Sequence, residues 1–282
     1  MNRLGKDIHI YFPSQYPKKI SPAQRYRMEQ FEELLEKERI FIHCFPFFEK
    51  KMYPILFERR YIVKKALAIC KGFINRFIEL FSLNKYDLIF INREASPLGP
   101  PIFEWLYVKI FRKKIIYDFD DAVWLSNTSE ANRITHFFKA FWKIKHIIRW
   151  TTVVICGNDY LSSFAKKYNN NIVLLPTVVD TKKRFNKTVE QDVSEVTIGW
   201  TGSFSTMPYL EKLIPVQRQK ALEIPFKFIL ISNKKPYFEL PNMEYVDWDE
   251  ENEVSKLAEC QVGLMPMDKD EWACGKCGLK IL

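Results

Sequence analysis

The sequence predicts an α/β protein with parallel sheets, and three observations lead to that prediction. Short apolar segments typical of buried strands alternate with longer segments whose apolar residues recur at helical spacing. A polar segment from Pro176 to Glu195 interrupts this alternation, which starts again at Val196. The 282 residues are 47% hydrophobic and 27% charged, which is typical of globular proteins, and the chain is long enough for two domains.

The first half of the chain contains six expected strands with helices between them, an order that favours a parallel sheet with right-handed crossovers. Ser21, Pro22 and Gln24 predict a helix start, with Ser21 as N-cap and Gln24 completing a capping box. Asn158 predicts a second N-cap. We expect strands at 8–12, 40–45, 88–92, 115–117, 153–156 and 172–175, and helices at 22–37, 54–83, 102–111, 132–150 and 158–168.

The second half repeats the alternation on a smaller scale. Pro215 lies inside an expected helix and predicts a kink there. We expect strands at 196–200, 226–232, 243–246 and 262–265, and helices at 207–222 and 250–258. The domain division that follows is an N-terminal domain over 1–176, a linker over 177–195 and a C-terminal domain over 196–282.

Polar side chains follow the expected strands of the first domain, at the sheet edge where parallel α/β sheets bind ligands. These side chains are Ser14, Arg93, Glu94, Asp118, Asp120, Asp121 and Asn158. The residues that we expect to act in catalysis are Asp120, Asp121, Arg93 and Glu94. Asp118 and Asp120 form a D-x-D pattern, which can hold a divalent metal ion. We favour a metal-free role, in which a carboxylate orients a substrate hydroxyl or caps the following loop.

The segment from Val196 to Leu210 is typical of a strand, a turn with two glycines and a helix start. Gly199 and Gly202 lack a Cβ, so the backbone can bend sharply and a ligand can come close. Ser203 precedes the helix, whose first N–H groups favour an anion such as phosphate. The same pattern also occurs in an ordinary strand-to-helix turn.

Charge favours an anionic partner, because 43 Lys and Arg against 34 Asp and Glu give a net charge of +9. Arg25 and Arg27 lie at the end of a helix that disfavours cations, so they either meet an anionic ligand or belong to a solvated basic face. The basic residues are scattered and no binding motif is present, so we expect no nucleic acid. One basic helix face either lies on anionic lipid or is solvated; it comprises Arg59, Arg60, Lys64, Lys65 and Lys71.

Several classes of protein are not expected. The N-terminal residues contain no apolar signal segment, no apolar run is long enough to cross a bilayer, and the six cysteines suit a reduced, cytoplasmic protein. Cys274 and Cys277 form a C-x-x-C without a second pair, so we expect neither zinc nor redox chemistry. No G-x-G-x-x-G follows a strand, which argues against an oxidoreductase with a Rossmann fold.

Several segments in order resemble glycosyltransferase family 4, the group-one glycosyltransferases. Residues 153–185 (V-V-I-C-G-N-D-Y-L-S-S-F-A … I-V-L-L-P-T-V-V-D … F) resemble the end of that family's first domain. Residues 196–210 resemble its donor-side strand and turn, and residues 261–282 (Q-V-G-L-M-P-M-D … W-A-C-G-K-C-G-L-K-I-L) its donor-site strand, loop and helix start. The S-P-A-Q-R-Y-R and I-I-Y-D-F-D-D-A-V-W-L-S blocks resemble the same branch.

The resemblance implies a GT-B fold, in which two Rossmann-like domains with parallel sheets face a cleft. It implies transfer of a sugar, with retention, from a nucleotide-sugar donor to a glycan or lipid-linked acceptor in cell-surface polysaccharide synthesis. No metal and no further cofactor are expected, and the protein would work in the cytoplasm, with peripheral contact at the inner face of an anionic membrane. Hydrogen-bond donors and cations are needed to stabilise the negative charge that grows on the leaving diphosphate. The expected donor-binding residues are Gly202, Ser203, Lys276, Lys280 and Arg25.

The sequence departs from the family pattern at two places. The usual Gly-Gly of the first loop is replaced by the stretch from Ser14 to Ser21. The spaced glutamate pair of the donor helix is incomplete, because its first position falls at Gly275 and its second beyond Leu282. We therefore expect an incomplete second domain, and the alternative function is an inactive fragment or a remnant that binds a nucleotide or glycan.

Overall fold

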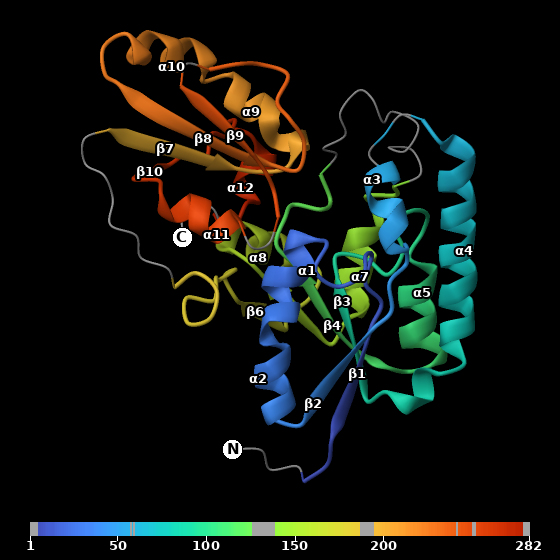
Figure 1. Ribbon diagram of the computed structural model, residues 1–282. Coiled ribbons are helices and arrows are strands. Elements are labelled where there is room, and N and C mark those ends of the chain that lie inside the picture. The colour runs from blue at the N-terminus through green and yellow to red at the C-terminus, as the bar shows by residue number, and fades with distance from the viewer. Residues whose placement is uncertain are drawn as a thin grey trace. The chain divides into compact units, whose positions relative to one another are not determined.

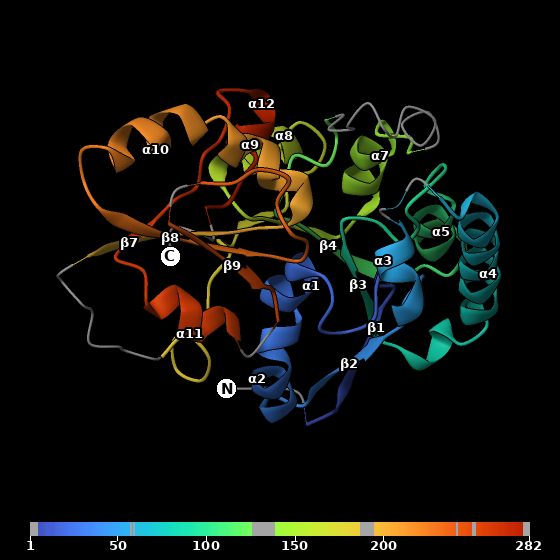
Figure 2. The ribbon, with the colours of Figure 1, turned by 45° about the horizontal axis from the view of Figure 1, so that its top comes forward.

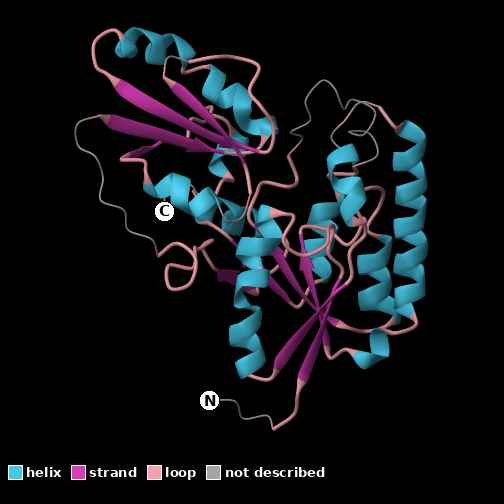
Figure 3. Ribbon diagram, viewed as in Figure 1, coloured by secondary structure: helices cyan, strands magenta, loops and turns pink. Residues whose placement is uncertain are grey.

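The computed structural model describes residues 5–56, 58, 60–125, 139–186, 195–240, 242–249 and 252–278. The chain forms two compact units: Met1–Thr177 with Cys274–Cys277, and Val178–Ala273 with Gly278–Leu282. Each unit consists of a parallel sheet with helices on both faces (Figures 1 and 3). The predicted α/β class with parallel sheets is therefore confirmed.

The sheet of the first unit has six parallel strands in the order β2-β1-β3-β4-β5-β6. The chain leaves β1 toward β2 and later returns to the other side of β1, so the winding direction reverses between β1 and β3. Such a switch point places the loops after neighbouring strands around one crevice. The strands are β1 (Ile8–Phe12), β2 (Ile40–Cys44), β3 (Leu88–Asn92), β4 (Lys114–Phe119), β5 (Val153–Cys156) and β6 (Ile172–Leu174).

Helices cover both faces of this sheet. Figures 1 and 2 show α1 (Pro22–Arg27) and α2 (Glu32–Lys37) on one face and α4 (Ile62–Leu80) and α5 (Ile102–Trp105) on the other. On the α2 face, Ile10, Phe12 and Phe90 of the strands pack with Met28 and Leu35. The other elements are η1 (Glu29–Phe31), η2 (Lys50–Met52), α3 (Tyr53–Leu56), η3 (Leu83–Lys85), the π-helical turn η4 (Leu106–Ile110), α7 (Lys143–Trp150) and α8 (Asp159–Ala165).

The second unit has four parallel strands in the order β10-β7-β8-β9. Helices α9 and α10 lie on one face of this sheet and α11 on the other (Figure 1). Its core contains Trp200, Phe228 and Leu230 of the strands with Met207 and Leu210 of α9. The elements are β7 (Val196–Thr201), η6 (Phe204–Thr206), α9 (Met207–Glu211), α10 (Ile214–Ala221), β8 (Phe226–Ser232), β9 (Met243–Asp247), α11 (Asn252–Ala258), β10 (Val262–Gly263) and α12 (Glu271–Cys274).

Three expected long helices are interrupted. The helix expected at 54–83 is observed as two helices, the short α3 and, from Ile62, α4; Tyr61, directly before α4, has a left-handed backbone with φ of 65°. The helix expected at 22–37 is broken at Met28, whose φ of −138° is not helical. The helix expected at 207–222 divides before Ile214, so Pro215 lies in the first turn of α10, where its missing N–H costs nothing, and the predicted kink is wrong.

The two predicted N-caps have different outcomes. Asn158 caps α8, since its Oδ1 accepts from the Leu161 N–H at 2.9 Å. Ser21 occupies the N-cap position of α1 but its side chain makes no cap hydrogen bond. The capping box is wrong because Gln24 bonds the backbone of Tyr16 instead, accepting from its N–H at 3.1 Å and donating to its C=O at 2.9 Å. The helix expected at 132–150 is observed as α7, and residues 126–138 lie outside the described part of the chain.

Helix α4 packs closely against Phe47 at Gly72. A Cβ built at Gly72 would lie 2.4 Å from the buried Phe47 ring, which also contacts Phe73. We therefore predict that Gly72→Ala lowers the free energy of unfolding by about 1–3 kcal/mol, although alanine favours helix. Urea unfolding measures this change. The double variant Gly72→Ala/Phe47→Leu should recover part of the loss, and a stabilised Gly72→Ala protein would contradict the packing described.

Candidate functional site

A buried ion pair lies beneath the carboxyl edge of the first sheet. Arg27 of α1 donates from Nε to both oxygens of Asp118, at 3.1 and 3.2 Å, and from Nη2 to Oδ1. Both side chains are only 2% exposed. Asn92, which pairs with Asp118 across β3 and β4, donates to Oδ2 at 2.8 Å. The carboxylate of Asp118 is thus engaged by internal donors.

The environment of this pair shifts both ionisations. Burial raises the pKa of the Asp118 carboxyl, and the hydrogen bonds from Arg27 only partly offset that rise. Burial works against the Arg27 charge, but its bonds to Asp118 outweigh this effect and raise its pKa. Arg27 also donates to the Leu175 C=O at 2.6 Å. The anionic partner of Arg27 is therefore internal, and the expected solvated face is wrong, because Arg25 and Arg27 are both buried.

Next to this pair, Arg93, which directly follows β3, connects the carboxylates of Asp120 and Asp121, which directly follow β4. Its guanidinium donates from Nη2 to Asp120 Oδ1 at 2.9 Å and also to Asp121 Oδ2. Lys276 donates to Asp121 Oδ1 at 2.7 Å. Arg93 and Lys276 remain about 30% exposed, at 31% and 28%, so this cluster faces solvent in part. The structure thus brings together four of the predicted site residues.

The cluster has two positive and two negative charges. Burial alone would raise the pKa of Asp120, but the charge and hydrogen bonds of Arg93 lower it overall. The two carboxylates in turn raise the pKa of Arg93 against the effect of its burial. Arg93 has a left-handed backbone with φ of 66°, which is uncommon outside glycine, and its N–H donates to the Asp118 C=O. This hydrogen bond continues the β3–β4 pairing one residue beyond Asn92.

The segment Cys274–Cys277 belongs to this site. Lys276 was predicted as a donor-binding residue, but the sequence did not indicate its contact with Asp121 or the contacts of this segment with Asn158. Asn158 Nδ2 donates to the carbonyls of Cys274 and Lys276, both at 3.1 Å. Gly157 permits the approach, since a Cβ there would lie 2.3 Å from the Cys277 sulfur. Burial raises the pKa of Cys277 to about 11, so its thiol is protonated at neutral pH. Gly157, directly after β5, was the one feature of the sequence that could have indicated this close approach.

Glu94 and its neighbours are held by a second set of contacts. Glu94 accepts from Gln15 at 2.8 Å and pairs with the buried Lys143 at 2.6 Å. The fully buried Arg76 of α4 donates to the Ser14 and Ala95 carbonyls at 2.7 and 3.0 Å. Arg76 thereby fixes the loops that follow β1 and β3. Sequence reasoning missed Arg76, although a lone arginine among the apolar residues of a helix was a usable signal.

The other predicted donor residues are distributed over both units. Arg25 lies buried in α1, with its guanidinium 5.3 Å from the Tyr26 ring centre. Gly202 and Ser203 belong to the second unit, where the Gly202 N–H donates to the Ile231 C=O at 3.0 Å. Gly202 thus extends the β7–β8 ladder. Lys280 lies outside the described residues, and Lys276 follows α12 without starting a helix in the described part of the chain.

Gly199 has a packing role in the second unit. A Cβ at Gly199 would lie 2.5 Å from the sulfur of Cys260, which precedes β10. The absence of a side chain therefore lets β7 and the segment before β10 come together. This contact explains the glycine without a ligand.

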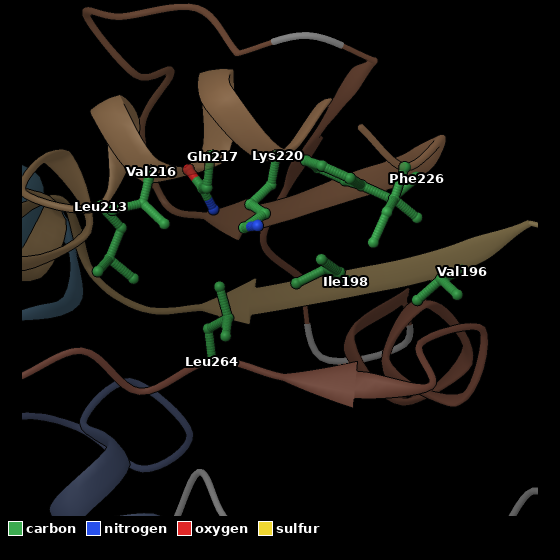
Figure 4. Close-up of a pocket in the computed structure, with 9 residues that line it drawn as sticks. Val196, Ile198, Leu213, Val216, Gln217, Lys220, Phe226 and Leu264 are labelled. Carbon is green, nitrogen blue, oxygen red and sulfur yellow. The ribbon is translucent and has the colours of Figure 1, made fainter. Parts of the chain in front are cut away.

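An apolar cavity of ≈ 370 Å³ lies in the second unit between α10 and the sheet (Figure 4). Its polar lining side chains are Gln217 and Lys220, which extend from α10 toward β7 (Figure 4). The remaining lining residues are Val196, Ile198, Leu213, Val216, Ile224, Phe226 and Leu264. This lining does not suit a charged diphosphate.

Comparisons with known proteins support the fold. Sucrose-phosphate synthase of Thermosynechococcus elongatus superposes with a TM-score of 0.61 at 13% identity, over 94% of this chain and 77% of that one. The catalytic domain of starch synthase IV from Arabidopsis thaliana, bound to ADP and acarbose, gives 0.57 at 9%, over 91% and 77%. A Listeria monocytogenes protein assigned as a UDP-N-acetylglucosamine 2-epimerase gives 0.54 at 7%, over 88% and 71%.

These identities are low, so the similarities establish the fold and nothing finer. The chain has the GT-B fold, with its two Rossmann-like units. No protein-family model matches the sequence, and none of the curated proteins compared with it is similar.

The buried pair leads to a prediction about stability. Asp118→Asn removes the negative charge and leaves Arg27 buried without a counter-ion, which should cost about 3–5 kcal/mol of unfolding free energy. Asp7→Asn serves as the matched control, because Asp7 pairs with Arg39 at an exposed position. We expect the control to change stability by less than about 1 kcal/mol. Equal losses in the two variants, measured by chemical denaturation, would contradict the role of burial.

The Arg93–Asp120 contact leads to a prediction about pH. Because the pKa of Asp120 is lowered from 3.8, its ionised form stabilises the fold above about pH 4, and this contribution is lost as the pH falls through the lowered pKa. Asp120→Asn should therefore cost about 1–2 kcal/mol at pH 7 and progressively less below pH 4. Urea unfolding at several pH values measures the difference. A difference that stays constant from pH 7 to pH 3 would show that Asp120 acts through shape alone.

Proposed function

We propose that this protein is a glycosyltransferase of family 4, which moves a sugar with retention from a nucleotide-sugar donor to a glycan or lipid-linked acceptor. The observation that carries the proposal is the cluster of Arg93, Asp120, Asp121 and Lys276 at the carboxyl edge of the first sheet. The GT-B fold supports it, since the fold neighbours include two sugar-polymer or sugar-phosphate synthases. The family motifs in the sequence support it independently.

The proposed roles follow from charge. Glycosyl transfer releases a nucleoside diphosphate, and cations that meet its growing charge stabilise the transition state. Lys276 and Arg93 are partly exposed cations held in place by carboxylates, so a diphosphate that displaces one contact finds a cation already oriented. Asp120 or Asp121, once released from its cation, can orient the acceptor hydroxyl. Arg25, Glu94, Gly202, Ser203 and Lys280 remain proposed contributors.

The proposed setting is synthesis of a cell-surface polysaccharide in the cytoplasm, at the inner face of an anionic membrane. Metal-free chemistry belongs to the same proposal, because ammonium and guanidinium groups supply the positive charge. A second candidate is a remnant that binds a nucleotide or glycan without transfer. It is favoured by one observation: Asp120 and Asp121 are each already paired with a cation.

Ligand binding is the first test. UDP, GDP, ADP and their sugars should be compared by thermal shift, and one nucleotide should raise the melting temperature because it binds the folded state. That nucleotide then enters a turnover assay with mono- and oligosaccharide acceptors. Binding with turnover supports the transferase, and binding without turnover supports the remnant. A cooperative melt that no nucleotide or nucleotide-sugar shifts argues against the transferase and against a nucleotide-binding remnant.

Lys276 provides the sharpest variant. Lys276→Ala should lower turnover by about a hundredfold, because one charged donor to the leaving group is lost. The exposed Lys269 is the matched control, and Lys269→Ala should leave turnover unchanged. Melting temperatures of both variants check folding. Full turnover by Lys276→Ala would remove this residue from the proposed site.

A further inference from the structure

The outward face of α4 is apolar, although helices at a protein surface normally present polar residues to solvent. Phe81 at its end is 89% exposed, Leu67 65% and Ile74 58%. We use the term apolar stripe for the exposed residues Val63, Leu67, Ile74, Phe77, Ile78 and Phe81. Together with the small exposed Cys70, they recur every three or four residues and therefore share one side of the helix over five turns.

The fold does not need this stripe, because α4 has a separate inner face. Gly72, Arg76 and Leu80 are buried there, and Phe73 contacts the Phe47 and Phe103 rings. Figures 1 and 2 show α4 at the periphery of the first unit, beside α5. Among the described residues, the stripe thus remains exposed after the core is complete.

The apolar surface continues from α4 onto the neighbouring helix. The Phe77 and Phe103 rings join α4 to α5, with centroids 5.0 Å apart. Beyond this contact, Ile102, Trp105 and Ile110 are each more than 40% exposed. Tryptophan at the margin of an apolar surface is typical of positions between hydrocarbon and water.

Basic side chains accompany the stripe. Helix α4 itself carries four Lys or Arg side chains and one Glu. Glu79 is already paired with the buried Arg76, and Glu49 with Lys51 and Lys71. Lys64 lies 5.0 Å from the Tyr61 ring centre at the start of the helix. The exposed Lys109 and Arg112 lie beside Ile110. The surplus charge around the stripe is therefore positive.

The positive charge around the apolar stripe favours one kind of binding partner over another. A second copy of the chain would bring two positive surpluses together, which is unfavourable. An anionic bilayer offers apolar depth for the stripe and negative headgroups for the flanking lysines and arginines. The structure contains no helix that is long and apolar enough to cross a membrane, as far as the described residues extend. A helix lying in the plane of the interface meets both requirements.

We propose that the face formed by α4, α5 and η4 docks on the surface of an anionic lipid bilayer, with the apolar stripe inserted below the headgroups. This inference locates the membrane contact that the proposed function includes. Only the biological purpose of docking rests on the proposed function. Docking itself requires neither donor nor acceptor, so the two proposals can fail separately.

The test is co-sedimentation of the full chain with vesicles. We expect binding to phosphatidylcholine vesicles that contain about 30% phosphatidylglycerol, and weaker binding to phosphatidylcholine alone or at high salt. The variant Leu67→Gln/Ile74→Gln/Ile78→Gln should bind about tenfold or more weakly, because apolar insertion is lost. Glutamine favours helix, and the three positions are exposed, so folding should be retained.

Leu34→Gln/Leu222→Gln is the control, since both leucines are exposed and belong to other elements, Leu34 to α2 and Leu222 to the C-cap of α10. It should bind vesicles as the unchanged protein does. Failure of the unchanged protein to bind anionic vesicles, or equal binding by the triple variant, would overturn the proposal. Sedimentation velocity without lipid adds a further test: a dimer that the triple variant abolishes would assign the stripe to self-association and overturn membrane docking. Nucleotide-induced thermal shifts, measured in parallel, report on the proposed function separately.

Discussion

The Arg27–Asp118 ion pair is the contact on which the rest of the carboxyl edge of the first sheet depends. Through Asp118 it joins α1 to β4 and to Asn92 of β3, and through the Leu175 carbonyl it reaches the chain beyond β6. A charge pair that is only 2% exposed is costly to break, because Arg27 without Asp118 would remain a buried, uncompensated charge. The pair therefore holds the end of β4 in place, and Asp120 and Asp121 follow two and three residues after Asp118.

Around this anchor, the structure separates carboxylates with internal partners from those at the surface. Both oxygens of Asp118 bind donors inside the protein, whereas Asp120 and Asp121 hold the partly exposed cations Arg93 and Lys276. The two positive and two negative charges of this cluster satisfy one another without a ligand. Under the proposed function, an anionic leaving group would compete with Asp120 and Asp121 for Arg93 and Lys276.

Helix α4 serves two purposes through its two faces. Its inner face supplies Arg76, which holds the loops after β1 and β3 and so supports the carboxyl edge of the first sheet. Its outer face carries the apolar stripe. A substitution on the inner face can therefore affect the carboxyl edge of the first sheet, whereas a substitution on the outer face changes the exposed surface. Side chains about half a helical turn apart point in opposite directions.

The sequence by itself determined the α/β class, most strand positions, the cap at Asn158 and the strand ends that carry Arg93 and Asp120, because these depend on local periodicity and on the rule that parallel strands end at one edge. Tertiary structure decided the rest. Arg27 meets Asp118 across 91 positions and Lys276 meets Asp121 across 155, so no local pattern could reveal either pairing. Gln24 likewise left the predicted capping box for Tyr16, because the folded loop offered it two backbone partners. Local propensity selects elements, whereas the partners of buried polar groups are selected by whichever donors and acceptors the fold brings within reach.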